Sequence, residues 1–416
     1  MADPSGSQRR GRGARISGCI LAKNEEARIA GALRSLAAVT DELVVVDNGS
    51  TDSTREVAGS FGARIIELPA ANHDGARNAY LAAASGDWVL VLDADERLDS
   101  THAMAIRDAL DAAPDQLGAL RLPCFNYHGD GGWCCTWILR VWRRHPAIRY
   151  ERRLIHSSVF PSLVRAGYRL YASYAPIHHV DALTPGRTEA KRERNVRRIA
   201  EDLPIEPGLQ VFLALEYEAL GEHERALAEL REAVAPKRPP WSPYWTAMAH
   251  LFLARFTLRG GGSPDEARAW LRAMHSVRAA LPDPEHACLA WAESHVAEQN
   301  YAAALDRVNE ALRAMPQSPH MLLNKAALSS LHGDVPDTDA LDRVLELNPL
   351  ALHPILYRSC SSRNIYAPQS SLLSCTPNLY RQLADSAAPD TDAYKHWDGA
   401  LAAALRHCDE PEPDRW

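Results

Sequence analysis

The stretch Asp87-Trp88-Val89-Leu90-Val91-Leu92-Asp93-Ala94-Asp95-Glu96 decides the fold, because an apolar run ends there in two carboxylates separated by one residue. A short apolar run that ends sharply is typical of a buried strand in an α/β sheet. Ligands of open α/β sheets bind outside the carboxyl ends of the strands, so Asp93 and Asp95 are expected to face the binding crevice. Carboxylate oxygens are ligands for hard divalent cations, and the stretch therefore predicts a metal-dependent site.

Strand and helix patterns alternate around this stretch. Strands are expected over residues 16–21, 42–46, 64–68 and 88–92, and helical patterns follow the first three of them. Ile29, Leu33 and Leu36 share one face of the first helix, as a helix packed on a sheet requires. Gly49 permits a tight turn after the second strand. The alternation predicts a parallel sheet covered by helices.

Four motifs in this order resemble those of the bacterial family 2 glycosyltransferases of the GT-A fold. The matching segments are Ala22-Lys23-Asn24-Glu25-Glu26, Val46-Asp47-Asn48-Gly49-Ser50-Thr51-Asp52, Ala76-Arg77-Asn78 and Leu92-Asp93-Ala94-Asp95-Glu96. The resemblance implies an α/β GT-A domain, Rossmann-like with a mostly parallel sheet. It also implies a nucleotide-sugar donor, UDP- or GDP-linked, and a divalent metal cofactor, Mg²⁺ or Mn²⁺.

The same resemblance implies roles for individual residues. Asp47 and Arg77 are expected to contact the nucleotide base, Asp93 to lie near the ribose and the metal, and Asp95 to ligate the cation that bridges the two phosphates. The remaining residues expected to line the nucleotide-sugar site are Asn24, Glu25 and Ala94. The nucleoside diphosphate leaves the sugar as an anion, and a metal held by carboxylates stabilises the charge that develops on it.

Two adjacent histidines are further candidate metal ligands. In relatives, a histidine before a basic helical run returns to the metal or to the diphosphate, and here His178 and His179 precede the run Lys191-Arg192-Glu193-Arg194-Asn195. A neutral imidazole is a common metal ligand. The alternative is that one histidine is packed in the core and that the arginines form a solvated helix face.

The catalytic base departs from the family pattern. Many relatives read His-Glu where this chain has His156-Ser157, and that glutamate is a plausible base. Its replacement by Ser157 leaves Glu151 and Asp130 as candidate catalytic residues by elimination. Segments 121–160 look like the acceptor side of the fold.

A dinucleotide-dependent oxidoreductase would use the same alternation of strands and helices. It requires Gly-x-Gly-x-x-Gly between the first strand and its helix, where this chain has Lys23-Asn24-Glu25-Glu26. The glycine pattern therefore argues against that class.

After about residue 205 the pattern is helical only, and it repeats. Ala226, Ala267, Ala304 and Ala340 occupy equivalent places in four helical segments and are 36 to 41 residues apart. This spacing is near the tetratricopeptide period of roughly 34 residues. Ala219-Leu220-Gly221 matches the small-residue turn between paired helices. We expect an all-α helical-repeat domain, with an irregular helical bundle as the alternative.

The expected organisation has four parts: a disordered leader over residues 1–15, the GT-A domain over 16–203, tetratricopeptide-like repeats over 204–350, and a C-terminal cap and tail over 351–416. Stacked helix pairs present surfaces suited either to the acceptor or to dimerisation, so a homodimer is one expected arrangement.

Composition indicates a cytoplasmic enzyme. The net charge of −7 does not favour nucleic acid as a partner, and no run of the sequence approaches the ~20 apolar residues that span a bilayer. The eight cysteines show no disulfide framework, as expected of reduced thiols.

These features predict an inverting, metal-dependent transfer of a sugar to a hydroxyl or thiol of a small molecule, a glycan or a peptide. Inversion follows from the resemblance. The combination of a family 2 domain with repeats is similar to the S-glycosyltransferases of glycocin biosynthesis, and thiol-conjugating transferases of antibiotic pathways are a second possibility. Sulfur tolerates a missing base, because a thiol with a pKa near 8.5 is already partly ionised at neutral pH. A function of another class is a helical-repeat scaffold with a non-catalytic nucleotide-binding domain.

Overall fold

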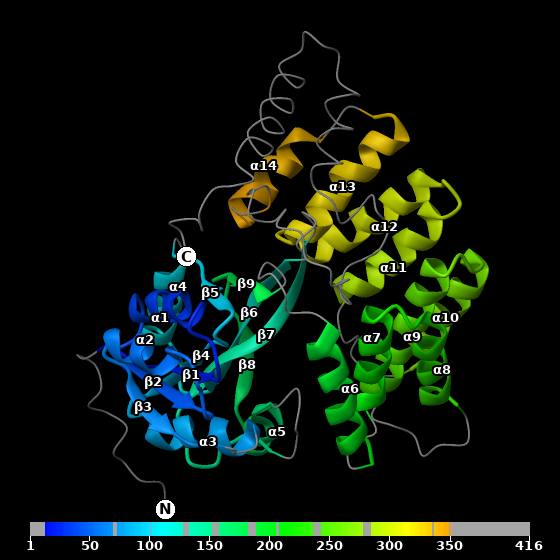
Figure 1. Cartoon of the computed structure of the whole chain (residues 1–416). Helices are drawn as coiled ribbons and strands as arrows, with labels where there is room; N and C mark the ends of the chain where they lie inside the picture. Colours follow the sequence, from blue (N-terminus) through cyan, green and yellow to red (C-terminus); the bar gives the residue numbers. More distant parts are fainter. Residues whose placement is uncertain are drawn as a thin grey trace, which may run out of the picture. The chain divides into compact units, whose positions relative to one another are not determined.

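The computed structural model describes residues 13–69, 73–100, 102–127, 133–151, 158–181, 189–204, 208–235, 243–277, 284–334, 337–348 and 351. The chain divides into two compact units (Figure 1). The first unit holds the described residues up to Phe125 and those from Thr136 to Val180. The second unit holds Asn126 to Cys135 and the described residues from Asp181 onward.

The first unit alternates strands and helices in the predicted order. Its elements are β1 (Ile16–Ala22), α1 (Ile29–Ala37), β2 (Glu42–Asp47), α2 (Thr54–Ser60), β3 (Arg64–Glu67), α3 (His73–Ala83), β4 (Trp88–Val91), β5 (Glu96–Leu98), α4 (Ala103–Asp111), β6 (Leu117–Tyr127), β7 (Trp133–Arg143), α5 (Phe160–Arg165), β8 (Arg169–Ala172) and β9 (Ile177–His179). The four predicted strands are therefore confirmed. The tips of β6 and β7 belong to the second unit.

The strands form one mixed sheet in the order β3-β2-β1-β4-β7-β6-β9-β5, with β8 paired to β6. Strands β3, β2, β1 and β4 are parallel neighbours, so their carboxyl ends meet at one edge. The pairing then reverses, because β7 runs antiparallel to β4 and β9 runs antiparallel to β5. This arrangement confirms the predicted GT-A-like α/β fold.

The apolar runs are continuous because the sheet is buried on both faces. Along β4, Trp88 and Leu90 pack into one core with α1 and α4, while Val89 and Val91 pack into the other with α3. On α1, the predicted inward face is confirmed, since Ile29, Leu33 and Leu36 are fully buried. The parallel strands are thereby held rigidly, and their carboxyl ends provide a fixed edge for a site.

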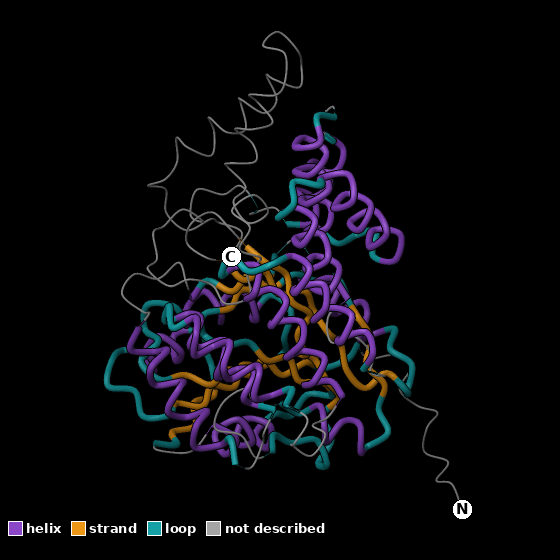
Figure 2. Tube along the Cα trace, turned by 90° about the vertical axis from the view of Figure 1, so that its right-hand side faces the viewer, coloured by secondary structure: helices purple, strands orange, loops and turns teal. Residues whose placement is uncertain are grey.

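All described elements of the second unit after β9 are helices, as Figure 1 shows, and Figure 2 colours helices purple and strands orange. Its helices are α6 (Glu189–Asp202), α7 (Leu209–Ala219), α8 (His223–Ala233), α9 (Pro243–Arg259), α10 (Pro264–Ser276), α11 (Pro284–Val296), α12 (Tyr301–Ala314), α13 (Pro319–His332) and α14 (Thr338–Leu347). Helices α7 to α14 pack as four successive pairs. The predicted helical-repeat architecture is confirmed.

The repeat appears in the turns as well as in the helices. The four aligned alanines lie near the start of the second helix of each pair, and each is buried. Among the residues that the structure describes, the turn inside each pair contains one with positive φ: Gly221 (81°), Gly261 (76°), Gln299 (58°) and Gly333 (91°). Only the third of these is not a glycine, although glycine is the residue that adopts this conformation without steric cost.

Two aromatic side chains from the tips of β6 and β7 lie inside the second unit. Tyr127 and Trp133 are both 1% exposed. The hydroxyl of Tyr127 lies 3.1 Å from Oδ1 of Asn348, and the ring of Trp133 lies 6.0 Å from that of His320. The second unit thus includes Asn126 to Cys135, which precede strands β8 and β9 in the chain.

Parts of the predicted organisation lie outside the described residues. These are residues 1–12 of the expected leader, Asp130, the segment 152–157 that contains Ser157, and residues 352–416 of the expected cap and tail. Among the described residues, no helix combines the length and the apolar character that crossing a membrane requires.

Candidate functional site

The register of β5 against β9 decides which side chains meet at the edge of the sheet. Glu96 pairs with His179, and Arg97 pairs with His178. Neighbouring residues of a strand point to opposite faces, so the two histidines point in opposite directions. His178 is 1% exposed, and its Nε2 lies 3.1 Å from Oδ2 of the buried Asp99. The structure therefore places His178 in the protein interior and not with the other predicted metal ligands.

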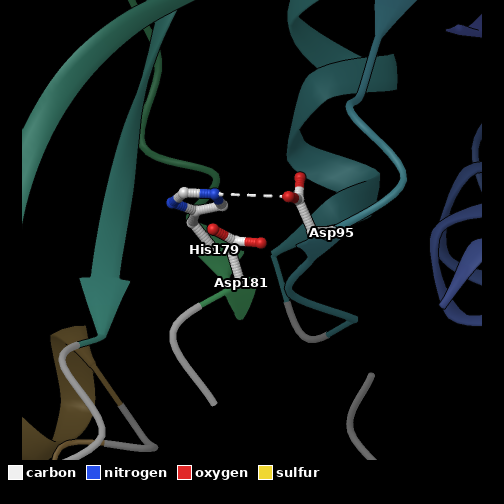
Figure 3. A group of neighbouring side chains, drawn as sticks. All are labelled: Asp95, His179 and Asp181. Carbon is white, nitrogen blue, oxygen red and sulfur yellow. Dashed lines mark ion pairs between the residues drawn. The ribbon is translucent and has the colours of Figure 1, made fainter. Parts of the chain in front are cut away.

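Three side chains form a group that suits a metal ion. The ligand atoms of Asp95, His179 and Asp181 all lie within 4.8 Å of one another. Figure 3 shows the imidazole of His179 directed at Asp95, with Nε2 3.7 Å from Oδ2. Asp95 is also tied to β9 through its carbonyl oxygen, which accepts a hydrogen bond of 2.9 Å from the Val180 amide. Two carboxylates and an imidazole, all half-buried, fit the ligand preferences of Mn²⁺ and Mg²⁺.

Sequence reasoning did not identify Asp181. The signal was present, because Asp181 follows His179 by two residues and a spacing of two returns to the same side of an extended chain.

Two guanidinium groups hold Asp93. Arg77 from α3 lies 2.7 Å from Oδ1, and Arg140 from β7 lies 2.8 Å from Oδ2. Burial alone would raise the pKa of Asp93, but the positive charges of Arg77 and Arg140 outweigh it and hold this pKa well below its usual range. Asp93 is therefore ionised, and its oxygens are oriented before any ligand arrives.

Glu96 is the second carboxylate bound by Arg140. Nε of Arg140 lies 3.0 Å from Oε2 of Glu96, and Nη2 lies 2.5 Å from Oε1. Burial raises the pKa of Glu96 although Arg140 acts against the rise. Neither Glu96 nor Arg140 was among the predicted site residues, because nothing in the sequence shows that β7 lies beside β4.

Asn24, Glu25 and Asp47 build the loops that follow β1 and β2. Asn24 has a φ of 56°, and its Oδ1 accepts a hydrogen bond of 2.8 Å from the Thr51 amide. The Glu25 amide donates to Oγ1 of Thr54 over 2.7 Å. Asp47 is 1% exposed, and its Oδ2 accepts from the Ser50 amide over 3.1 Å. The hydrogen bonds of Asn24 and Glu25 join the loop after β1 to the loop after β2, and the bond of Asp47 closes the loop after β2 itself.

Ala94 lies between the two aspartates and is 4% exposed. Its carbonyl oxygen accepts a hydrogen bond of 2.8 Å from Nη1 of Arg97. Arg97 is itself buried, and its Nη2 donates to the carbonyl oxygen of Arg28 over 2.7 Å. The turn that presents Asp93 and Asp95 is thus anchored from its inner side.

Helix α3 links this turn to the segment that carries Glu151. Asn78 forms two hydrogen bonds of 2.9 Å with the backbone of Tyr150, one to its carbonyl oxygen and one from its amide. Arg77 lies 5.5 Å above the ring of Tyr150, whose hydroxyl lies 2.8 Å from that of Tyr80. The Ala76-Arg77-Asn78 motif therefore connects Asp93 to the backbone of Tyr150, the residue before Glu151.

Glu151 is paired with two arginines. Nε of Arg149 lies 2.9 Å from its Oε1, and Nη2 of Arg165 lies 2.6 Å from the same oxygen. These hydrogen bonds, first from Arg149 and then from Arg165, lower the pKa of Glu151. A carboxylate stabilised in this way is a weaker proton acceptor. The other candidate base, Asp130, lies outside the described residues.

Comparisons with known proteins show what parts of this chain are similar to. Residues 17–169 match the family model described as glycosyl transferase family 2. A TPR repeat-containing protein of Synechococcus elongatus is 28% identical over an alignment of 321 residues, which covers 73% of this chain and 76% of that protein. An uncharacterized glycosyltransferase of Rickettsia typhi is 46% identical over 84 residues, which are 20% of this chain and 29% of that protein.

Solved structures also resemble parts of the chain. One is glucosyl-3-phosphoglycerate synthase from Mycobacterium tuberculosis in complex with Mn²⁺, UDP and glucosyl-3-phosphoglycerate. It is 20% identical, and the match covers 44% of this chain and 76% of that chain with a TM-score of 0.33.

Proposed function

We propose that this chain, which carries a family 2 glycosyltransferase domain in residues 17–169, transfers a sugar from a nucleoside diphosphate donor to an acceptor with inversion at the anomeric carbon. The observation that carries the proposal is the grouping of Asp95, His179 and Asp181 at the edge where the parallel strands end. A divalent cation held by these three side chains would stabilise the negative charge on the departing diphosphate.

The charges of the neighbouring residues support this proposal. At their formal charges, Asp93, Asp95, Glu96 and Asp181 contribute four negative charges, and Arg77 and Arg140 contribute two positive ones. The excess of two negative charges suits one divalent cation. We assign Arg77 and Asp93 to the donor side of the site, where the ion pair between them keeps both groups oriented.

Transfer with inversion is a single displacement. The acceptor forms a bond to the anomeric carbon while the bond to the diphosphate oxygen breaks, and the acceptor proton passes to a base. A hydroxyl acceptor needs that base in position, and Glu151 and Asp130 remain the candidates. We place the acceptor on the side formed by residues 121–160.

A thiol acceptor is the second candidate, and the state of Glu151 favours it. Two arginines lower the pKa of this carboxylate, which weakens it as a base for a hydroxyl. A thiol with a pKa near 8.5 is a few per cent thiolate at neutral pH and needs less assistance. We keep the hydroxyl first because the paired arginines weaken only one of the two candidate bases.

The first experiment identifies the donor. The full chain is screened by thermal shift against UDP, GDP and other nucleoside diphosphates, each with Mn²⁺ and with EDTA. A ligand at 100 times its dissociation constant adds about 2.7 kcal/mol to the free energy of unfolding. The proposal expects one nucleotide to stabilise the protein only with the metal. A screen in which no nucleotide stabilises it would count against the proposal.

The second experiment identifies the acceptor atom. Matched thiol and hydroxyl acceptors are offered with that donor between pH 6 and 9, to the parent protein and to Glu151→Gln. Preferential transfer to sulfur, together with retained turnover by Glu151→Gln, would establish that the acceptor is a thiol. Transfer only to hydroxyls that Glu151→Gln abolishes would exclude it and would identify Glu151 as the base.

A further inference from the structure

Arg140 binds two carboxylates at once at the turn that presents Asp95. Its Nη2 lies 2.8 Å from Oδ2 of Asp93 and 2.5 Å from Oε1 of Glu96, and its Nε lies 3.0 Å from Oε2 of Glu96. A planar guanidinium can contact both acids in this way, whereas the point charge of a lysine cannot reproduce the fork.

The turn itself is closed by its first and last residues. The Asp93 amide donates to Oε2 of Glu96 over 3.0 Å, and the Glu96 amide donates to the carbonyl oxygen of Asp93 over 3.0 Å. Ala94 and Asp95 lie between these two points. Arg140 therefore holds both ends of the segment that carries Asp95.

Arg140 lies on β7, a strand that is paired within the sheet. Strand β7 pairs with β4 through Trp88, Val89 and Leu90, and the two residues after Arg140, Val141 and Trp142, are buried. The side chain of Arg140 is 17% exposed, and that of Glu96 is 5% exposed. Without Arg140, Glu96 would be a buried carboxylate that has lost its ion-pair partner, a state that proteins avoid by moving the group or protonating it.

We propose that Arg140 is a positioning residue, which holds the Asp93 to Glu96 turn so that Asp95 faces His179 and Asp181. This inference rests on the proposed metal-dependent transfer. Arg140 acts here through the two carboxylates, and it needs no contact with the reacting atoms.

The test measures Mn²⁺ binding to the full chain, read from the loss of the electron paramagnetic resonance signal of free Mn²⁺. Arg140→Lys keeps the positive charge and removes the fork. It is expected to weaken Mn²⁺ binding at least tenfold while the melting temperature without metal stays within about 2 °C of the parent.

The matched control is Arg143→Lys, three residues farther along β7. Arg143 donates to the carbonyl oxygens of Leu117 and Pro114 and lies 4.5 Å above the ring of Trp88, so it shares the strand and the chemistry but not the carboxylates. Mn²⁺ binding by Arg143→Lys is expected to stay within twofold of the parent.

A pair of variants keeps the inference testable if Arg140→Lys also lowers the melting temperature. Arg140→Met leaves Glu96 without its ion-pair partner, and Arg140→Met with Glu96→Gln removes that charge. The double variant is expected to bind Mn²⁺ at least threefold more tightly than Arg140→Met alone. A double variant no better than the single one would overturn the coupling between Arg140 and Glu96.

The kinetic readout separates positioning from general stability. The Mn²⁺ concentration that gives half-maximal transfer should rise at least tenfold in Arg140→Lys, and kcat at saturating Mn²⁺ should fall less than this. If Arg140→Lys keeps the Mn²⁺ affinity of the parent, and its transfer rate depends on Mn²⁺ concentration as in the parent, the inference about Arg140 is wrong. The proposed function is unaffected by that result. Failure of the parent itself to bind Mn²⁺ would defeat the proposed function.

Discussion

Glu96 and His179 are direct register partners on the antiparallel strands β5 and β9. Their pairing brings the turn after β4, which carries Asp95, beside the end of β9. Asp181 lies two residues after that end, so the same pairing brings it close to Asp95. The same register sends Arg97 and His178 to the opposite face, where both are buried. One pairing thus separates the residues that face the candidate metal site from those that support the fold.

The two histidines should therefore respond differently to the same substitution. His179→Asn is expected to weaken Mn²⁺ binding at least tenfold without changing stability, because it removes a ligand from a half-buried group. His178→Asn is expected to lower the free energy of unfolding by about 1–3 kcal/mol, because it disturbs the partner of the buried Asp99. Urea unfolding and Mn²⁺ titration check both. The reverse pattern would show that the faces of β9 are misassigned.

Arg77→Met should chiefly weaken donor binding, by roughly ten- to a hundredfold, because it removes a charge-assisted contact from the crevice and leaves one oxygen of Asp93 without its guanidinium. The KM for the donor is the measurement. Arg55→Met is the control, since Arg55 forms an exposed ion pair with Glu67, and this variant should keep both the donor affinity and the stability of the parent. An unchanged donor affinity in Arg77→Met would refute the assignment of Arg77 to the donor side.

A fragment of residues 1–205 should retain nucleotide binding but lose acceptor turnover or solubility. Truncation removes Asn348 and His320, and so exposes Tyr127 and Trp133, each of which is 1% exposed in the full chain. Analytical gel filtration and donor binding check this prediction. Full acceptor turnover by the fragment would exclude a role for the repeats in recognition.

In the full chain, Tyr127→Phe should lower the free energy of unfolding by about 1 kcal/mol, because it removes one buried hydrogen bond.

Gln299→Gly should stabilise the protein by about 0.5–1 kcal/mol. Gln299 has a φ of 58°, and the equivalent turns of the other three repeats use glycine. Gly221→Ala is the converse variant, because Gly221 has a φ of 81° and open space around it, and it should destabilise by about 1 kcal/mol. Denaturant unfolding measures both. Equal stability of Gln299→Gly and the parent would indicate that the turn carries no strain.

The sequence was sufficient where local pattern determines structure. The runs that became β1, β2 and β4 are apolar because both faces of the sheet are buried, and the inward face of α1 follows from helical spacing. The aligned alanines of the repeats are buried because small residues permit close helix packing. These features depend on neighbours within one element.

The site was less accessible, because it depends on contacts between distant segments. The choice between His178 and His179 requires the register of a three-residue strand, which no periodicity reveals. Arg140 reaches Asp93 and Glu96 only because β7 joins β4 in antiparallel fashion. The lowered pKa of Glu151 depends on the nearby Arg149 and also on Arg165, which lies on α5. The sequence motifs indicate which residues matter but not which of them meet.

The most direct measurement is release of nucleoside diphosphate from the identified sugar donor by the full chain and by Asp95→Ala, with Mn²⁺, with EDTA, and after Mn²⁺ is restored. The account predicts that the parent turns over only with the metal and recovers when Mn²⁺ returns. It predicts that Asp95→Ala loses at least a hundredfold, which corresponds to about 2.7 kcal/mol of transition-state stabilisation, at an unchanged melting temperature. Turnover by Asp95→Ala within tenfold of the parent, or turnover by the parent that is indifferent to EDTA, would contradict it.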